Sequence, residues 1–182
     1  MLTSESYSEL VNKVYNRSRQ EGNRSYPVAC FEIFMLEQAQ QRASRKEVQL
    51  FRQLGEIFDW NMPRRQRNTY VKKLQSGFTL VLTDLSKTIL WTSRNFLTMT
   101  GYSHAEAVGK TPRILQGPET DPATLLRVHE SLKRADSVKA DLLNYRKDGE
   151  SYICRVEIDP LYDSHGELTH FLAVESEVKE SL

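Results

Sequence analysis

The sequence predicts an α+β fold: a five-stranded antiparallel sheet with short helices on one face, preceded by an N-terminal helical extension. Apolar residues recur at helical spacing up to about residue 60, whereas β-prone runs dominate after residue 77. The order along the chain is two β-prone runs, then helix signals, then three further β-prone runs. This order favours an antiparallel sheet covered on one face. The charge changes at the same place, since residues 1–73 carry 13 basic and 8 acidic side chains and residues 74–182 carry 12 and 16. We therefore expect a helical extension over 1–73 and a sheet domain over 74–182.

The extension is expected to contain about three helices, near residues 5–20, 27–42 and 45–60. Capping boxes at 6–9 and 44–47 mark two starts, and Pro27 suits a first helical turn. Such short helices must bury their apolar faces, so we expect them to cap the sheet, to form a homodimer, or both. The basic residues of 64–73 are interpreted as a solvated linker rather than as a nucleic-acid patch.

Strands are expected at 78–84, 88–92, 139–147, 151–161 and 168–178. Asp148-Gly149 is a strong hairpin signal between the third and fourth of them. Between the second and third strands, a capping box at 103–106 and the pair Asp121-Pro122 each predict the start of a helix.

Composition excludes several classes of function. The net charge is +1, which disfavours bulk binding to nucleic acid or membrane. No apolar run approaches the ~20 residues that span a bilayer, and the N-terminus has no signal-peptide pattern, so a cytoplasmic protein is expected. Cys30 and Cys154 suggest neither a disulfide framework nor a metal cluster. No catalytic constellation stands out, so we expect no enzyme.

Several segments of the sheet domain resemble the PAS family. Residues 95–103 (NFLTMTGYS) with 106–110 (EAVGK), and residues 144–149 (NYRKDG), agree with motifs of that family in order and spacing. Residues 109–122 (GKTPRILQGPETDP) resemble its light-oxygen-voltage (LOV) branch, in which a cysteine of this segment forms a photoadduct with flavin mononucleotide (FMN). Pro112 stands at that position here, and proline has no nucleophile, so the resemblance implies no adduct chemistry there.

The resemblance also assigns the family's other flavin contacts. Arg113 (at the phosphate), Gln116 and Asn144 (at the polar edge of the ring) are retained. Four contacts are replaced, by Thr111, His129, Cys154 and Glu175. An ionised glutamate only accepts hydrogen bonds, and cysteine lacks an amide's paired donor and acceptor. We therefore expect that tight flavin binding is lost, with no cofactor favoured and FMN the first candidate to test.

Alternatives remain at three of these candidate pocket positions. Cys154 is either a relocated reactive thiol or, as we favour, a small buried apolar side chain. Arg113 either binds a phosphate or pairs with a carboxylate such as Glu119 or Asp121. Glu175 is either a buried pH-sensitive group or, as we favour, an exposed or arginine-paired glutamate.

The expected function is that of a non-enzymatic sensory and protein-interaction module, signalling through a homodimer and a partner protein. The alternative is a flavin-binding photo- or redox sensor that works without the adduct cysteine. A sensor that binds haem, with His104 or His129 as axial ligand, is a weaker form of this alternative, because no local sequence pattern marks either histidine as a haem ligand.

Overall fold

The computed structural model describes residues 26–178, with side chains from Phe31 onward. The helix predicted at 5–20 lies outside these residues. The chain divides into two compact units, Met1–Lys46 and Glu47–Leu182. The helix α2 (Tyr26–Ile57) runs through the boundary, and the second unit contains all the other described elements.

The break predicted between residues 42 and 45 is wrong, because α2 is one helix of 32 residues. No glycine or proline lies between Pro27 and Gly55 to end it. The Glu47 carboxylate accepts a hydrogen bond from the backbone N–H of Arg94, far along the chain, instead of closing a capping box. A pattern that can cap a helix is also compatible with a helix interior.

The basic segment after Pro63 is also not a linker. It forms the helix α3 (Arg64–Gln75), with Tyr70 and Leu74 buried. These two residues and Val71 provide an apolar stripe at helical spacing that is narrow because the rest of the helix is polar. In the sequence, five basic residues among twelve obscure a stripe of only three apolar ones.

The five-stranded antiparallel sheet is confirmed, in the order β2-β1-β5-β4-β3. The strands are β1 (Thr79–Asp84), β2 (Ile89–Thr92), β3 (Val138–Tyr145), β4 (Ser151–Tyr162) and β5 (Leu168–Glu177). The predicted hairpin joins β3 to β4, but it is longer than the two-residue loop that Asp148-Gly149 suggested. The strands stop at Tyr145 and Ser151, and Gly149, at φ 93°, donates its N–H to the Arg146 carbonyl oxygen. Because β1 and β5 lie side by side, the last strand occupies the centre of the sheet.

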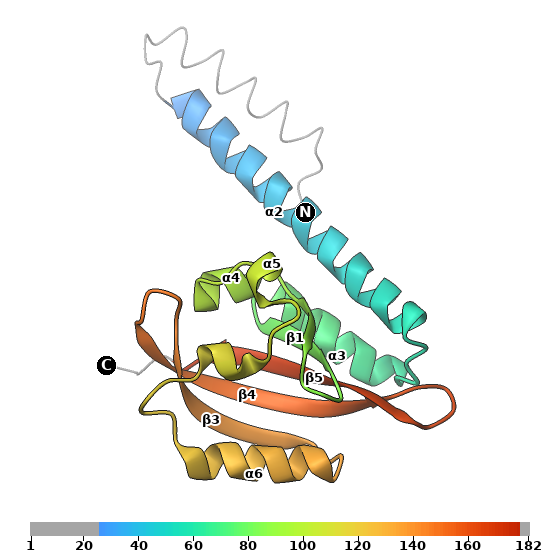
Figure 1. Cartoon of the computed structure of the whole chain (residues 1–182). Helices are drawn as coiled ribbons and strands as arrows, with labels where there is room; N and C mark the ends of the chain where they lie inside the picture. Colours follow the sequence, from blue (N-terminus) through green and yellow to red (C-terminus); the bar gives the residue numbers. More distant parts are fainter. Residues whose placement is uncertain (1–25, 179–182) are drawn as a thin grey trace, which may run out of the picture. The chain divides into compact units, whose positions relative to one another are not determined.

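Short helices cover one face of the sheet, which we call the inner face (Figure 1). They are α4 (Asn95–Thr100), α5 (His104–Ala107), the 3₁₀ helix η1 (Pro112–Leu115) and α6 (Pro122–Lys133). Both predicted helix starts are confirmed. The Glu106 carboxylate accepts from the Ser103 N–H at 2.9 Å, and the Asp121 carboxylate caps α6 through the N–H groups of Ala123 and Thr124.

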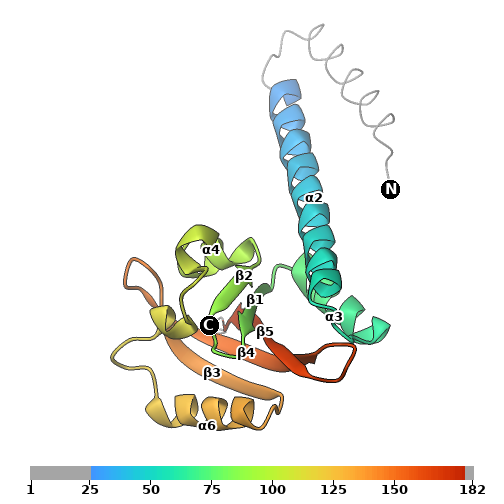
Figure 2. The same ribbon diagram turned by 45° about the vertical axis from the view of Figure 1, so that its right-hand side comes forward.

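The opposite, outer face packs against α3 and the last turns of α2 (Figure 2). Phe51 is 2% exposed, and its ring centroid lies 6.0–6.2 Å from those of Trp60, Tyr70 and Trp91. Leu80, Leu82, Leu172 and Val174 of the central strands complete this core. Part of the helical extension therefore caps the sheet, one of the two roles that its apolar stripe predicted.

Candidate functional site

Buried polar side chains gather at one end of the inner face. Asn144 and Tyr152 are direct cross-strand partners on β3 and β4, and Thr79 and Glu175 are direct partners on β1 and β5. Since side chains two apart share a face, these residues and Cys154 lie on the same face as the inner core. All five are buried, and we call them the inner-face polar cluster: Thr79, Asn144, Tyr152, Cys154 and Glu175.

Glu175 is the most unusual member of this cluster. Its side chain is buried, and Oε2 has no hydrogen-bond partner among the described residues. The expectation of an exposed or arginine-paired glutamate is therefore wrong. Burial disfavours the charged form and raises the pKa of Glu175 from 4.5 to about 7. The sequence could not decide this, because a carboxylate on a strand ordinarily lies on the solvent side.

Tyr152 and Arg146 close the end of the cluster. The Tyr152 hydroxyl is buried beside the Asn144 side chain, its cross-strand neighbour, but makes no well-aligned hydrogen bond within the described part of the chain. The Arg146 guanidinium lies 4.5 Å from the centroid of the Tyr152 ring, a cation–π contact. Arg146 also donates to Glu150, to Glu177 and to the Met99 carbonyl oxygen, and so connects the β3–β4 hairpin to α4 and to the end of β5. Sequence reasoning did not assign a site role to either residue.

Cys154 has the environment of a structural cysteine, as we favoured. Its side chain is 0% exposed and packs with Met99 and Tyr152. Burial first, and then the nearby Glu175 carboxyl group, raise the pKa of the thiol. A thiol that stays protonated at neutral pH is a poor nucleophile.

The remaining candidates belong to η1, which the buried Leu115 anchors in the inner core. Arg113 is exposed and makes no ion pair with another described residue. The pairing expected with Glu119 or Asp121 is not found, because Asp121 caps α6 and Glu119 accepts from the Tyr145 hydroxyl at 3.4 Å. Gln116 is half-buried and follows η1 directly. The sheet thus brings Asn144, Cys154 and Glu175 together, while Arg113 is exposed on η1.

The residues at the other replaced positions lie around the same helices. Pro112 is the first residue of η1, Thr111 precedes it, and His129 is exposed on α6. His104 Nδ1 lies 3.2 Å from the Thr92 hydroxyl. Residues 26–178 contain no group of three or more His, Cys, Asp or Glu side chains that could hold a metal ion. No helix within that range is long and apolar enough to cross a membrane.

With this fold and this polar cluster, the chain belongs to the PAS domain family, whose model matches residues 75–180. Its relatives are LOV proteins. It is 37% identical over 105 residues to phototropin-2 of Oryza sativa subsp. japonica, covering 56% of this chain and 12% of that protein. It is 40% identical over 90 residues to a blue-light-activated histidine kinase of Brucella anthropi, covering 50% and 18%. The chain therefore spans less than a fifth of either relative.

Solved structures agree with this assignment. A LOV domain from work on a flavin analogue superposes with a TM-score of 0.57 at 39% identity, covering 62% of this chain and 86% of that one. The LOV domain of an Erythrobacter litoralis blue-light-activated histidine kinase gives 0.54 at 30% identity, covering 57% and 97%. The light-state dimer of the fungal photoreceptor Vivid gives 0.53 at 27%, covering 56% and 78%. The PAS fold and its LOV relationship are confirmed.

Proposed function

We propose that this chain is a non-enzymatic sensory and protein-interaction module of the PAS family that works without a cysteine–flavin adduct. The supporting observation is the distribution of its thiols. The segment 109–116 contains no cysteine, and Pro112 stands where the LOV resemblance places one. The sheet's one cysteine, Cys154, is buried with its pKa raised. Neither position offers a thiolate.

The two packed faces of the sheet supply a route for a signal. The inner-face polar cluster includes Glu175 of β5, and the next residue back, Val174, belongs to the outer core with Phe51 and Tyr70. A change of ligand or protonation that moved β5 would act directly on the packing of α2 and α3. Such coupling requires two states that differ in their affinity for the ligand.

An illumination experiment tests the absence of adduct chemistry. The whole chain is mixed with FMN and irradiated with blue light, with and without the substitution Cys154→Ser. We expect the visible absorption of any bound flavin to respond identically in the two proteins, with no reversible bleaching that depends on the thiol. Reversible bleaching that disappears in Cys154→Ser would overturn the proposal.

A second candidate function, flavin-dependent sensing without the adduct, is supported by the orphaned atoms of the cluster. Glu175 Oε2 and the Tyr152 hydroxyl are buried and need polar partners. A neutral Glu175 both donates and accepts, as an amide does, and therefore suits a flavin edge better than its ionised form. Asn144, Gln116 and Glu175 would then hold the ring and Arg113 the phosphate, and bound flavin would supply light absorption and one-electron chemistry.

The visible spectrum of the purified chain distinguishes the two candidates. Stoichiometric flavin absorption that survives gel filtration supports the second candidate. A colourless protein whose melting temperature does not change with added FMN supports a module that acts through protein contacts alone.

We further propose that the module forms a homodimer through its N-terminal helices and the sheet. Phe31, Ile33, Met35 and Leu36 of α2 are each about half exposed or more. Exposed apolar side chains grouped on one helix are typical of an interface. Light scattering of the whole chain carrying Leu36→Glu tests this. A dimer that persists at the same concentration would remove this part of α2 from the interface.

A further inference from the structure

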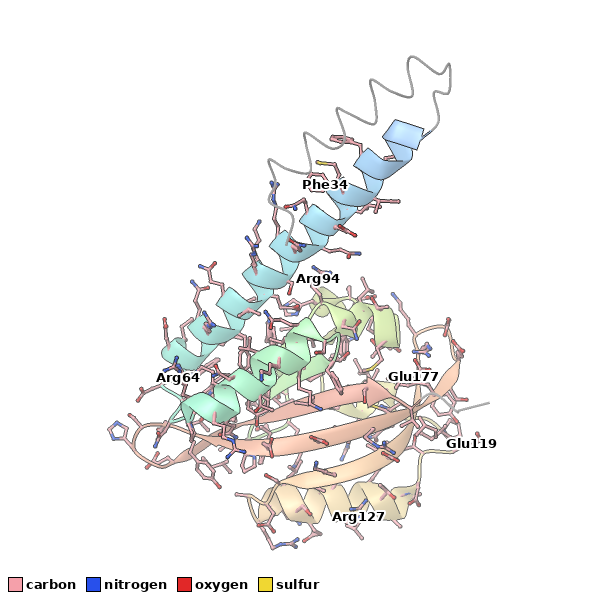
Figure 3. All side chains as sticks on the ribbon, turned by 180° about the vertical axis from the view of Figure 1, so that it is seen from behind. Phe34, Arg64, Arg94, Glu119, Arg127 and Glu177 are labelled. Carbon is pink, nitrogen blue, oxygen red and sulfur yellow. The ribbon has the colours of Figure 1, made fainter. Side chains whose placement is uncertain are left out.

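The helix α3 carries an uncompensated positive charge on the outer side of the molecule. Its twelve residues include five basic and no acidic side chains. Arg64, Arg65, Arg67 and Lys72 are exposed, and Lys73 is half-buried, with its amine 4.0 Å from the centroid of the Phe78 ring. We call these five residues the α3 basic face. Figure 3 shows Arg64 at the start of this helix.

Several cations elsewhere in the described domain form ion pairs, although others, such as Lys110 and Arg113, do not. Within the described chain, cations of the sheet and of the inner-face elements form ion pairs with neighbouring carboxylates at 2.5–3.0 Å. None of the residues of the α3 basic face takes part in any of them. The positive field is therefore concentrated on one helix of a domain that is otherwise balanced or acidic.

Helix stability accounts for Lys72 and Lys73, which lie in the last turn, but not for the three arginines. The first turn of α3 contains arginines and no acidic residue, although the positive end of the helix dipole favours acidic side chains there. Arg64 and Arg67, three residues apart and therefore neighbours on the helix surface, also repel each other, at a cost of about 0.2–0.5 kcal/mol. Glutamate in place of Arg64 would relieve both effects without touching Tyr70 or Leu74.

We propose that the α3 basic face is the docking surface for a partner protein that presents an acidic segment. The proposal deepens the proposed function, because it gives the interaction module a surface and a class of partner, and it is independent of whether flavin binds. The same helix packs on β1 and β5 through Tyr70 and Leu74. A shift of the sheet would therefore move the docked partner.

The chemistry of α3 favours a protein over the other polyanions. Its one aromatic side chain, Tyr70, is buried and donates to Asp159 at 2.6 Å, so no ring on α3 is available for stacking on bases. Its apolar stripe is already packed on the sheet, so it cannot insert into a lipid surface. Residues 74–182 carry 12 basic and 16 acidic side chains, which repel an extended phosphate backbone.

The test uses fluorescence anisotropy with the whole chain and a fluorescein-labelled, glutamate-rich peptide long enough to follow the helix, about 18 Å. We expect binding that weakens with salt. The double substitution Arg65→Gln with Lys72→Gln is expected to weaken it about fivefold, as exposed charge pairs of ordinary strength would. Both side chains are exposed, so an unchanged melting temperature shows that the fold is kept.

The control removes the same charge from other elements, through Lys110→Gln with Arg127→Gln. Arg127 lies on α6, away from α3 (Figure 3), and both residues are exposed. Peptide binding that changes by less than twofold in the control supports the surface. Equal weakening in both variants would mean that only net charge matters. A natural chain that does not bind the peptide would show that α3 is not a docking surface for an acidic segment, and either result overturns the proposal.

Tighter binding of a mixed-sequence DNA duplex, or of anionic vesicles, at the same salt would overturn the class of partner. A failure here leaves the flavin and adduct experiments unaffected.

Discussion

Replacing the buried Glu175 by glutamine is expected to change how stability depends on pH. The amide keeps the shape of the carboxyl group but cannot ionise. Burial raises the pKa of Glu175 from 4.5 to about 7, so the folded protein holds a proton that the unfolded chain has released between these values. This contribution to stability is fully present below about pH 4.5 and is lost as the pH rises through about 7.

The magnitude follows from that interval. Each pH unit between the two pKa values corresponds to about 1.4 kcal/mol, so ionised Glu175 lowers the free energy of unfolding by about 3 kcal/mol relative to the neutral form. The Glu175→Gln protein is therefore expected to gain stability over the natural protein steadily from about pH 5 to pH 7 and to keep that gain at pH 8. Near pH 4.5 the two are expected to be similar.

Urea unfolding followed by tryptophan fluorescence, at several pH values between about 5 and 8, measures this difference. Taking the difference between two proteins at each pH cancels the contributions of all other titrating groups. Glu167→Gln is a matched control, because Glu167 is exposed in the β4–β5 turn, and it is expected to show no such trend. A difference that stays flat with pH, or a Glu175→Gln protein that is less stable at pH 8, would refute the assignment of Glu175 as a buried, unpartnered carboxyl.

Three further outcomes are expected. Phe51→Ala is expected to cost about 3–5 kcal/mol in urea unfolding because Phe51 is 2% exposed, whereas Leu50→Ala, at 42% exposure, is expected to cost far less; similar losses would contradict the outer core. His170 has its pKa lowered by burial, so its contribution to stability is fully present above about pH 6.5 and is lost as the pH falls below that value, through the lower pKa of the folded state; His170→Gln is expected to flatten that acid limb in thermal melts. Gly117→Ala places a Cβ 2.3 Å from the Tyr145 ring and is expected to cost about 1–3 kcal/mol. Adding Tyr145→Ala is expected to recover part of that cost, and a strictly additive double variant would show that the two residues do not meet.

Much of the sheet domain could be predicted from residues close together in the sequence. Asp148-Gly149 specifies its hairpin through local backbone geometry, and Ser103 with Glu106 specifies the start of a helix through two adjacent hydrogen bonds. Such signals are strong because the interacting groups are three or four residues apart. The helical extension was harder to predict from the sequence. Ser44–Glu47 matches a capping pattern, but the Glu47 carboxylate accepts a hydrogen bond from the backbone N–H of Arg94 instead.

The candidate site illustrates the same limit. Asn144, Cys154 and Glu175 could be selected as pocket positions because motifs on three strands resemble a known family. The burial of these three side chains could not be predicted from the sequence, because which face of a strand lies against the core depends on the elements that pack on it. Arg146 and Tyr152 were not selected, because their contact joins a hairpin to the ends of two other elements.

The sequence by itself determined the class of fold, the strand order along the chain and the absence of a thiol at Pro112, because periodicity, turn chemistry and residue identity are local properties. Only the tertiary structure decided that Glu175 is buried, with Oε2 lacking a hydrogen-bond partner among residues 26–178, and that the basic segment after Pro63 is a helix on the outer face. Both depend on which surfaces of distant elements meet, and the free energy of burying a side chain is set by those neighbours rather than by the residue alone.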